Sequence, residues 1–140
     1  MIRDLPSLAA TRAFGAEIAQ LVEPGTVIAI DGELGAGKTE FVRGFVAALA
    51  GAKDDEVASP TYALVHRYET DPAVWHADLY RLENERELIA VGAEEFLDPI
   101  DEITLVEWAE RFPNYLPKRT WYLRLETLSQ SARRATLTRP

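Results

Sequence analysis

One segment constrains the fold of this chain more than any other. It runs Gly-Glu-Leu-Gly-Ala-Gly-Lys-Thr from Gly32 to Thr39 and fits the pattern G-x-x-x-x-G-K-[ST] of a phosphate-binding loop. The apolar, β-branched run at 26–31 predicts a buried strand before it, and apolar side chains at helical spacing in 40–49 predict a helix after it. The motif therefore lies between a strand and a helix start, where a phosphate-binding loop must lie.

The residue types in this loop suit phosphate binding. Small residues let the backbone N–H groups of 34–39 turn inward as an anion nest, and the following helix start adds unpaired donors and partial positive charge. Lys38 supplies a charge for the outer phosphates, and the Thr39 hydroxyl can ligate magnesium. The predicted nucleotide-binding residues of this stretch are Gly32, Glu33, Leu34, Gly35, Ala36, Gly37, Lys38, Thr39 and Glu40. The alternative is a glycine-rich turn that binds no ligand.

The composition is that of one globular domain, which we expect to span residues 1–140. Of the 140 residues, 47% are hydrophobic and 27% are charged. The net charge of −8 disfavours non-specific binding to nucleic acid, because unneutralised carboxylates repel phosphate. A nucleotide can still bind, because an anion nest and one lysine act locally. A direct contact with tRNA is left open by this argument.

Several classes of site and location are disfavoured by what the sequence lacks. There is no cysteine, which excludes disulfides and thiolate metal sites. No segment has the long apolar run of a membrane helix, and the first residues lack the apolar core of a signal peptide. We therefore expect a cytoplasmic protein without a membrane partner.

The rest of the pattern predicts a mixture of helices and strands. Ser7 is a predicted N-cap for a helix over about 8–22, whose inner face would carry Leu8, Thr11, Phe14, Ile18 and Leu21. The short turn at 71–72 predicts an antiparallel hairpin of strands 62–68 and 74–78. The further predicted elements are a helix at 84–91 capped by Asn84, a helical turn at 93–97, a strand at 103–107, and paired strands at 120–126 and 135–138.

Two acids follow predicted strands and are candidates for metal and water chemistry. A nucleotide hydrolase needs an acid to hold magnesium and a group to orient the attacking water. Asp78 follows the strand residues 74–77, and Glu107 follows 103–106. Ligands gather at the carboxyl ends of strands in open α/β sheets, so either acid could face the phosphates. The alternative for each is a cap or turn acid.

Four other residues have both a functional and a structural interpretation. Thr61 could belong to a switch-like loop with Ser59 and Pro60, or to a Ser-Pro turn. His76 could be a base, although a packed, hydrogen-bonded core histidine is the favoured interpretation. Trp108 could stack on an aromatic ligand, dock a partner, or pack in the core. Arg133 could reach a phosphate or keep an edge strand soluble.

Several separate segments together resemble one family. They are Gly32 to Thr39, Ser59-Pro60-Thr61-Tyr62, His76-Ala77-Asp78-Leu79-Tyr80-Arg81-Leu82 and Leu105-Val106-Glu107-Trp108. Their order and spacing resemble the TsaE family of bacterial tRNA threonylcarbamoyladenosine biosynthesis. The loop alone is shared by many nucleotide hydrolases, whereas the combination of all four segments is specific.

The resemblance implies a fold, an activity and partners. It implies an α/β, three-layer P-loop domain with a mixed parallel and antiparallel sheet flanked by helices. It implies a slow ATPase that uses ATP and Mg²⁺. It also implies partnership with TsaD and TsaB, which transfer the threonylcarbamoyl group to the adenosine beside the tRNA anticodon, while the ATP cycle of TsaE supports their repeated turnover.

The same resemblance implies roles for individual residues. Lys38 would hold the phosphates, and Thr39 and Glu107 would ligate magnesium. Asp78 would lie at the attacking water or the outer metal shell, and Thr61 would belong to the switch-like loop. With Lys38, these two residues are the expected catalytic set.

The resemblance also places three residues around the nucleotide. Trp108 would lie at the site or at the partner face. The start of the first helix, Ser7 to Thr11, would lie near the adenine, which makes Thr11 an expected nucleotide contact. Arg133 would touch the nucleotide as well.

Two residues depart from the family pattern, Glu40 and Ala109, which stands where the family often has a proline after Glu-Trp. Glu40 follows Thr39 where the family commonly has a second threonine. A carboxylate suits a helix N-terminus but repels a nearby phosphate. We therefore expect the Glu40 side chain to point outward.

Two other functions share the phosphate-binding loop. A small-molecule kinase would normally add a lid with arginines, which the short, acidic or proline-containing loops argue against. A non-hydrolysing, nucleotide-gated binding module would shape a partner surface without turnover. In that case Asp78 and Glu107 would face away from the phosphates.

Overall fold

The computed structural model describes residues 1–53 and 64–140 of the chain. The strands are β1 (Ile2–Leu5), β2 (Val27–Asp31), β3 (Val65–Tyr68), β4 (Val74–Asp78), β5 (Ile103–Glu107), β6 (Trp121–Thr127) and β7 (Arg133–Thr138). The helices are α1 (Leu8–Leu21), α2 (Lys38–Ala47), α3 (Glu85–Ala90) and α4 (Ala93–Phe96), with 3-10 turns η1 (Ala109–Arg111) and η2 (Pro113–Tyr115).

The strands form one sheet with the order β1-β7-β6-β2-β5-β4-β3. The four central strands, β6, β2, β5 and β4, run parallel to one another. β3 pairs antiparallel with β4 at one edge, and β7 and β1 add antiparallel strands at the other. The expected α/β fold with a mixed sheet is confirmed, as are the hairpin of β3 with β4 and the pairing of β6 with β7.

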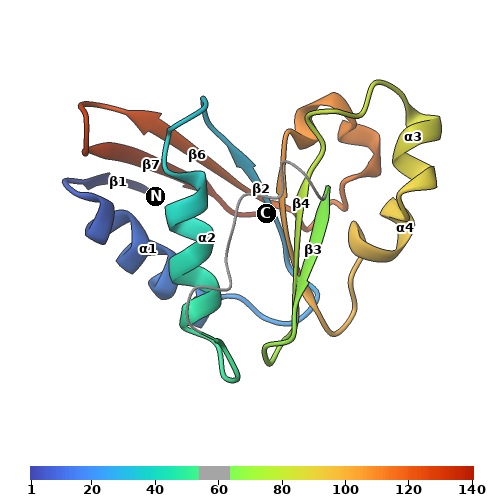
Figure 1. The fold of residues 1–140 in the computed structure, drawn as a ribbon, viewed down its shortest axis with the longest axis horizontal. Helices are drawn as coiled ribbons and strands as arrows, with labels where there is room; N and C mark the ends of the chain where they lie inside the picture. Colours follow the sequence, from blue (N-terminus) through green and yellow to red (C-terminus); the bar gives the residue numbers. More distant parts are fainter. Residues whose placement is uncertain (54–63) are drawn as a thin grey trace.

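Helices cover both faces of the sheet, which gives three layers (Figure 1). Alternate side chains of β2 enter two different cores, because successive residues of a strand point to opposite faces. Ile28 and Ile30 join the core under α1 and α2, whereas Val27 and Ala29 join the core under α3 and α4. The central strand is therefore buried on both faces, as its continuous apolar run predicts.

The predicted N-cap of α1 is present in the structure, but two residues expected on the buried face of α1 are exposed. The Ser7 hydroxyl accepts a hydrogen bond from the N–H of Ala10, so the predicted N-cap of α1 is confirmed. Leu8 and Leu21 were expected on its inner face, but they are 44% and 47% exposed. They lie at the two ends of α1, whereas α2 touches its middle. Crossing helices diverge away from their contact point, so the apolar stripe is buried only near the crossing.

The sequence did not predict β1. It has only four residues, and Arg3 and Asp4 interrupt its apolar pattern. Its partner is β7, about 130 positions away in the sequence, so no local signal specifies the pairing.

Among the described residues, no helix is long and apolar enough to span a bilayer.

Two glycines let α1 and α2 touch backbone to backbone. A β-carbon built at Gly44 would lie 1.8 Å from the carbonyl oxygen of Arg12, and one at Gly15 would lie 2.1 Å from that of Phe41. Real side chains do not fit at such distances, so both positions require glycine. This contact fixes α1 against the helix that follows the phosphate-binding loop.

We expect Gly44→Ala to destabilise the protein. Overpacking against a backbone oxygen costs about 1–3 kcal/mol, which outweighs the roughly 1 kcal/mol that alanine normally gains over glycine inside a helix. Urea denaturation should therefore show a lower free energy of unfolding for the variant. A variant as stable as the wild type, or more stable, would contradict the close contact of the two helices.

Candidate functional site

A cleft of about 240 Å³ lies where the phosphate-binding loop meets the carboxyl ends of β4 and β5. Its walls come from the loop, the first turns of α1 and α2, the residue after β5 and the start of β7. The lining residues are Leu8, Leu34, Gly35, Gly37, Lys38, Thr39, Glu40, Asp78, Glu107, Trp108 and Arg133. The sheet thus brings together most of the residues that the sequence singles out for function.

The loop has the backbone shape that its glycines allow. Gly35 and Gly37 have φ angles of 81° and 97°, a region that residues with a side chain rarely adopt. Gly37 is the N-cap of α2, and Lys38 is its first residue. The unpaired N–H groups and positive dipole end of α2 therefore lie at the cleft, which suits an anion such as phosphate.

Lys38 connects the loop to the strand-end acids. The side chain is largely buried, and its ammonium Nζ donates to the carbonyl of Gly32 over 2.6 Å. Nζ also lies 3.7 Å from Glu107 Oε1 and 5.0 Å from the ring centre of Trp108. The loop lysine is thus held between a carboxylate and an aromatic face, ready to pair with a second anion in the cleft.

His76 positions Glu107 from inside the sheet. Asp78 and Glu107 are register partners on the neighbouring strands β4 and β5, which places both acids at one edge. The ring nitrogen His76 Nε2 lies 2.6 Å from Glu107 Oε2, and His76 is fully buried. The favoured interpretation of His76 as a packed, hydrogen-bonded core residue is therefore confirmed. Among the described residues, its Nδ1 has no hydrogen-bond partner.

Asp78 is both a turn residue and a wall of the cleft. Its Oδ1 accepts a hydrogen bond of 2.9 Å from the backbone N–H of Tyr80 and so shapes the turn after β4. Asp78 can therefore be a turn acid and still face the phosphate-binding cleft. Burial raises the pKa of the Asp78 carboxyl, with a smaller contribution from the charge of Glu107.

Aromatic and cationic side chains stack outward from Lys38. The Trp108 ring contacts both the Lys38 ammonium and the ring of Tyr80, whose centre is 5.0 Å from its own. The Arg111 guanidinium lies over the Tyr80 ring and donates to the carbonyls of Tyr80 and Leu82. Trp108 itself has a φ of 61°, unusual for a residue with a side chain. The turn after β5 is therefore held so that its tryptophan faces the cleft.

Thr11 and Arg133 contact the glycines of the phosphate-binding loop. Thr11 is fully buried, and its methyl group lies 3.4 Å from where a β-carbon would stand at Gly37. Arg133 Nη2 donates to the carbonyl of Gly35 over 2.9 Å, and Nη1 donates to the carbonyls of Ser129 and Ala132. Arg133 also lines the cleft, whereas Thr11 does not. Their expected contacts with a nucleotide stay predictions.

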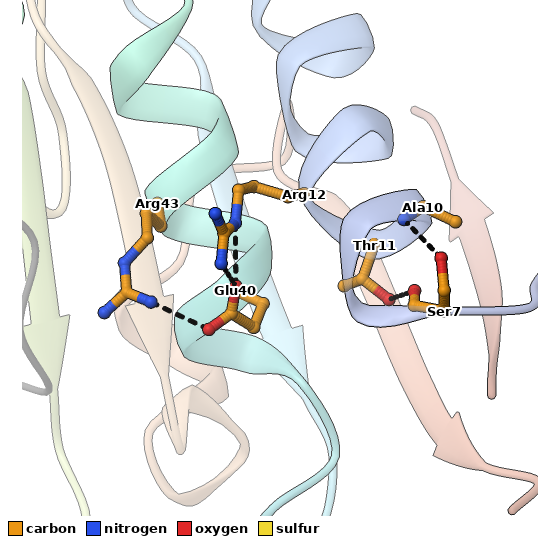
Figure 2. A network of polar contacts seen from close by, with 6 residues as sticks. All are labelled: Ser7, Ala10, Thr11, Arg12, Glu40 and Arg43. Carbon is orange, nitrogen blue, oxygen red and sulfur yellow. Dashed lines mark hydrogen bonds and ion pairs between the residues drawn. The ribbon is translucent and has the colours of Figure 1, made fainter. Parts of the chain in front are cut away.

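Glu40 binds two arginines, one from each of the paired helices (Figure 2). Arg12 of α1 donates from Nε and Nη2 to Glu40 Oε2 over 2.9 and 2.6 Å. Arg43 donates from Nη1 to Oε1 over 2.8 Å. The spacing of Glu40 and Arg43 is typical of a helical ion pair, but Arg12 lies 28 positions away and sequence reasoning missed it.

The oxygen ligands in the cleft suit magnesium. Thr39, Asp78 and Glu107 offer a hydroxyl and two carboxylates. Within residues 1–53 and 64–140, no group of three or more His, Cys, Asp or Glu side chains is placed to hold a metal ion. Magnesium is usually bound by one or two carboxylates together with substrate phosphates, so this donor set fits it better than a metal that needs an all-protein cage.

The remaining expected site residues lie elsewhere. Thr61 falls outside the residues that the structure describes. Gly32, Glu33 and Ala36 belong to the loop but do not line the cleft, whereas Leu34 lines it and is 97% exposed. Leu8 lines the cleft. The helical pattern placed it on the buried face of the helix, whereas the family resemblance placed residues 7–11 near the adenine. The exposure of Leu8 at the first turn of α1 has no local sequence signal.

We expect Asp78→Asn to stabilise the fold at neutral pH. Because burial raises the Asp78 pKa, the folded chain keeps this proton to a higher pH than the unfolded chain does. The wild type therefore loses stability as the pH rises from the unfolded pKa through the folded one. Urea denaturation should show a gain for the variant at about pH 7 and none near about pH 3.

The exposed acid Asp101 supplies a control for the loss of one negative charge. Asp101→Asn should not reproduce the pH-dependent gain. A variant Asp78→Asn that is less stable than the wild type at both pH values would contradict the burial effect.

Comparisons with known proteins place the chain in a family. The family model described as threonylcarbamoyl adenosine biosynthesis protein TsaE matches residues 5–135. The protein named tRNA threonylcarbamoyladenosine biosynthesis protein TsaE from Treponema pallidum (strain Nichols) is 33% identical, over 91% of this chain and 92% of the relative. The protein of the same name from Synechocystis sp. is 41% identical, over 78% of this chain and 70% of the relative.

A solved structure agrees on the fold. The crystal structure of Bacillus subtilis YdiB has a TM-score of 0.74, with 99% of this chain and 84% of that chain covered at 24% identity. The family-model match spans residues 5–135, a range that contains the loop and both strand-end acids. This chain belongs to the TsaE family of tRNA threonylcarbamoyladenosine biosynthesis.

Proposed function

We propose that this chain is a magnesium-dependent ATPase that acts in the cytoplasm with TsaB and TsaD. ATP binding and slow hydrolysis would support the transfer of the threonylcarbamoyl group to the adenosine beside the tRNA anticodon. The observation that carries the proposal is the convergence of Lys38, Asp78 and Glu107 on one cleft at the phosphate-binding loop. The family's place in this biosynthesis supports the choice of partners.

Residues of the loop would bind the phosphates. The N–H groups at the start of α2 point to where an anion binds, and Lys38 adds a buried cation beside them. Thr39 and Glu107 would hold magnesium, which would neutralise charge on the phosphates when bound. His76 fixes the Glu107 carboxylate by a buried hydrogen bond, so that this ligand is preorganised.

Asp78 would orient the attacking water. Its Oδ1 is engaged by the N–H of Tyr80, which fixes the carboxylate and leaves Oδ2 for the water. A carboxylate with a raised pKa is a better proton acceptor near neutral pH than an ordinary aspartate. Because Asp78 and Glu107 both line the cleft, the arrangement favours hydrolysis over a binding module without turnover. Phosphate release without an added acceptor would distinguish this activity from that of a kinase.

Two substitutions should separate binding from turnover. Lys38→Ala removes the buried cation and should weaken ATP binding roughly 10- to 100-fold, as expected for charged hydrogen bonds. Glu107→Ala should keep most of the affinity and lower the magnesium-dependent rate of hydrolysis roughly 100-fold or more. Calorimetry gives the affinities, and phosphate release gives the rates.

The matched control is Glu110→Ala, which removes an exposed acid three positions along the chain and outside the cleft. It should hydrolyse ATP like the wild type. Equal rates for the wild type and Glu107→Ala would contradict the role of Glu107 in holding magnesium.

A further inference from the structure

Glu40 places a negative charge beside a site that is built for anions. It is the third residue of α2 and lines the cleft next to Thr39. A carboxylate at a helix N-terminus is stabilised by the helix dipole, but it repels a phosphate bound at the same end. The chain therefore needs a device that lets a glutamate and a bound nucleotide coexist.

Both oxygens of the Glu40 carboxylate are bound by arginines (Figure 2). Arg12 approaches from α1 and binds Oε2, while Arg43 approaches from the next turn of α2 and binds Oε1. Each oxygen of the Glu40 carboxylate therefore has a guanidinium partner that offsets its negative charge. Figure 2 shows the carboxylate of Glu40 turned toward these two side chains.

The backbone contact between α1 and α2 makes the Arg12 bond possible. The carbonyl oxygen of Arg12 lies 1.8 Å from where a β-carbon would stand at Gly44, one turn along α2 from Glu40. The Arg12 side chain therefore starts close enough to reach Glu40. The neighbouring Thr11 methyl lies against Gly37 at the N-cap of α2. The same turn of α1 thus packs on the loop and restrains the acid beside it.

We propose that Arg12 and Arg43 raise nucleotide affinity through Glu40, by holding its carboxylate away from the bound phosphates. The proposal rests on the proposed function, because it assumes that phosphates bind in this cleft. It assigns the arginines an indirect role. Of the three residues, Glu40 lines the cleft, whereas Arg12 and Arg43 do not. Arg12 also uses both Nε and Nη2 on the carboxylate.

A double-mutant cycle on ADP affinity tests this indirect role. Arg12→Gln should weaken ADP binding roughly three- to tenfold, because an unrestrained carboxylate next to the phosphates is repulsive. In a Glu40→Gln background the same substitution should change the affinity less than roughly twofold, since no acid is left to restrain. Arg43→Gln should behave in the same way in both backgrounds. Calorimetry with ADP and magnesium gives each dissociation constant.

Salt and a remote arginine supply the controls. At about 0.5 M salt the effect of Arg12→Gln should shrink, because exposed charges are screened. Arg119→Gln also removes one cation that is paired with an acid, Asp98. Arg119 binds the carbonyl of Gly25 just before β2, at the end of that strand away from the phosphate-binding loop. The Arg119→Gln variant should leave ADP affinity unchanged. Circular dichroism and thermal unfolding should show that each variant is folded, because exposed ion pairs contribute little to stability.

Three outcomes would overturn the inference. Equal weakening by Arg12→Gln with and without Glu40 would mean that the arginine acts on the nucleotide directly. Unchanged affinity in both Arg12→Gln and Arg43→Gln would mean that Glu40 does not influence the phosphates. If the wild type does not bind ADP, both the proposed function and this inference are overturned. If it binds ADP but the effects of Arg12→Gln and Glu40→Gln on affinity are independent, only the inference is overturned.

Discussion

The parallel pairing of β5 with both β2 and β4 is the constraint on which the rest of the structure depends. In this register Ile30, Glu107 and Asp78 are neighbours across three strands, so the loop after β2 starts beside the two acids. Carboxyl ends of parallel strands meet at one edge, and helix starts that follow them direct their N–H groups to the same place. The cleft is thus a consequence of strand order rather than of any single contact.

Ion pairs and hydrogen bonds to two acids hold the walls of the cleft together. Glu107 is almost fully buried, and such a carboxylate needs partners. It has two, the hydrogen bond from His76 inside the sheet and the ammonium of Lys38 from the loop. On the outer side, Glu40 is balanced in the same way by arginines from two helices. Glu107 and Glu40 are therefore each paired with cationic groups within the chain. This pairing lowers the repulsion that the two acids would otherwise exert on a nucleotide.

Local patterns in the sequence predicted the loop, the helix caps and the strand-end acids, because each depends on residues close together in the chain. What failed depends on distant packing. The exposure of Leu8 follows from where α1 crosses α2, and the pairing of β1 depends on β7 at the other end of the sequence. The bond from Arg12 to Glu40 requires the glycine contact at Gly44, which no periodicity reveals. The metal and nucleotide roles stay predictions.

The central claim is that this chain hydrolyses ATP as a partner of TsaB and TsaD. The most direct test measures magnesium-dependent phosphate release by the purified chain alone and after addition of the TsaB–TsaD pair. The account predicts slow hydrolysis alone and a faster rate with the pair, with both rates abolished by EDTA. Hydrolysis that the pair does not change, or tight ATP binding without hydrolysis in either case, would contradict it.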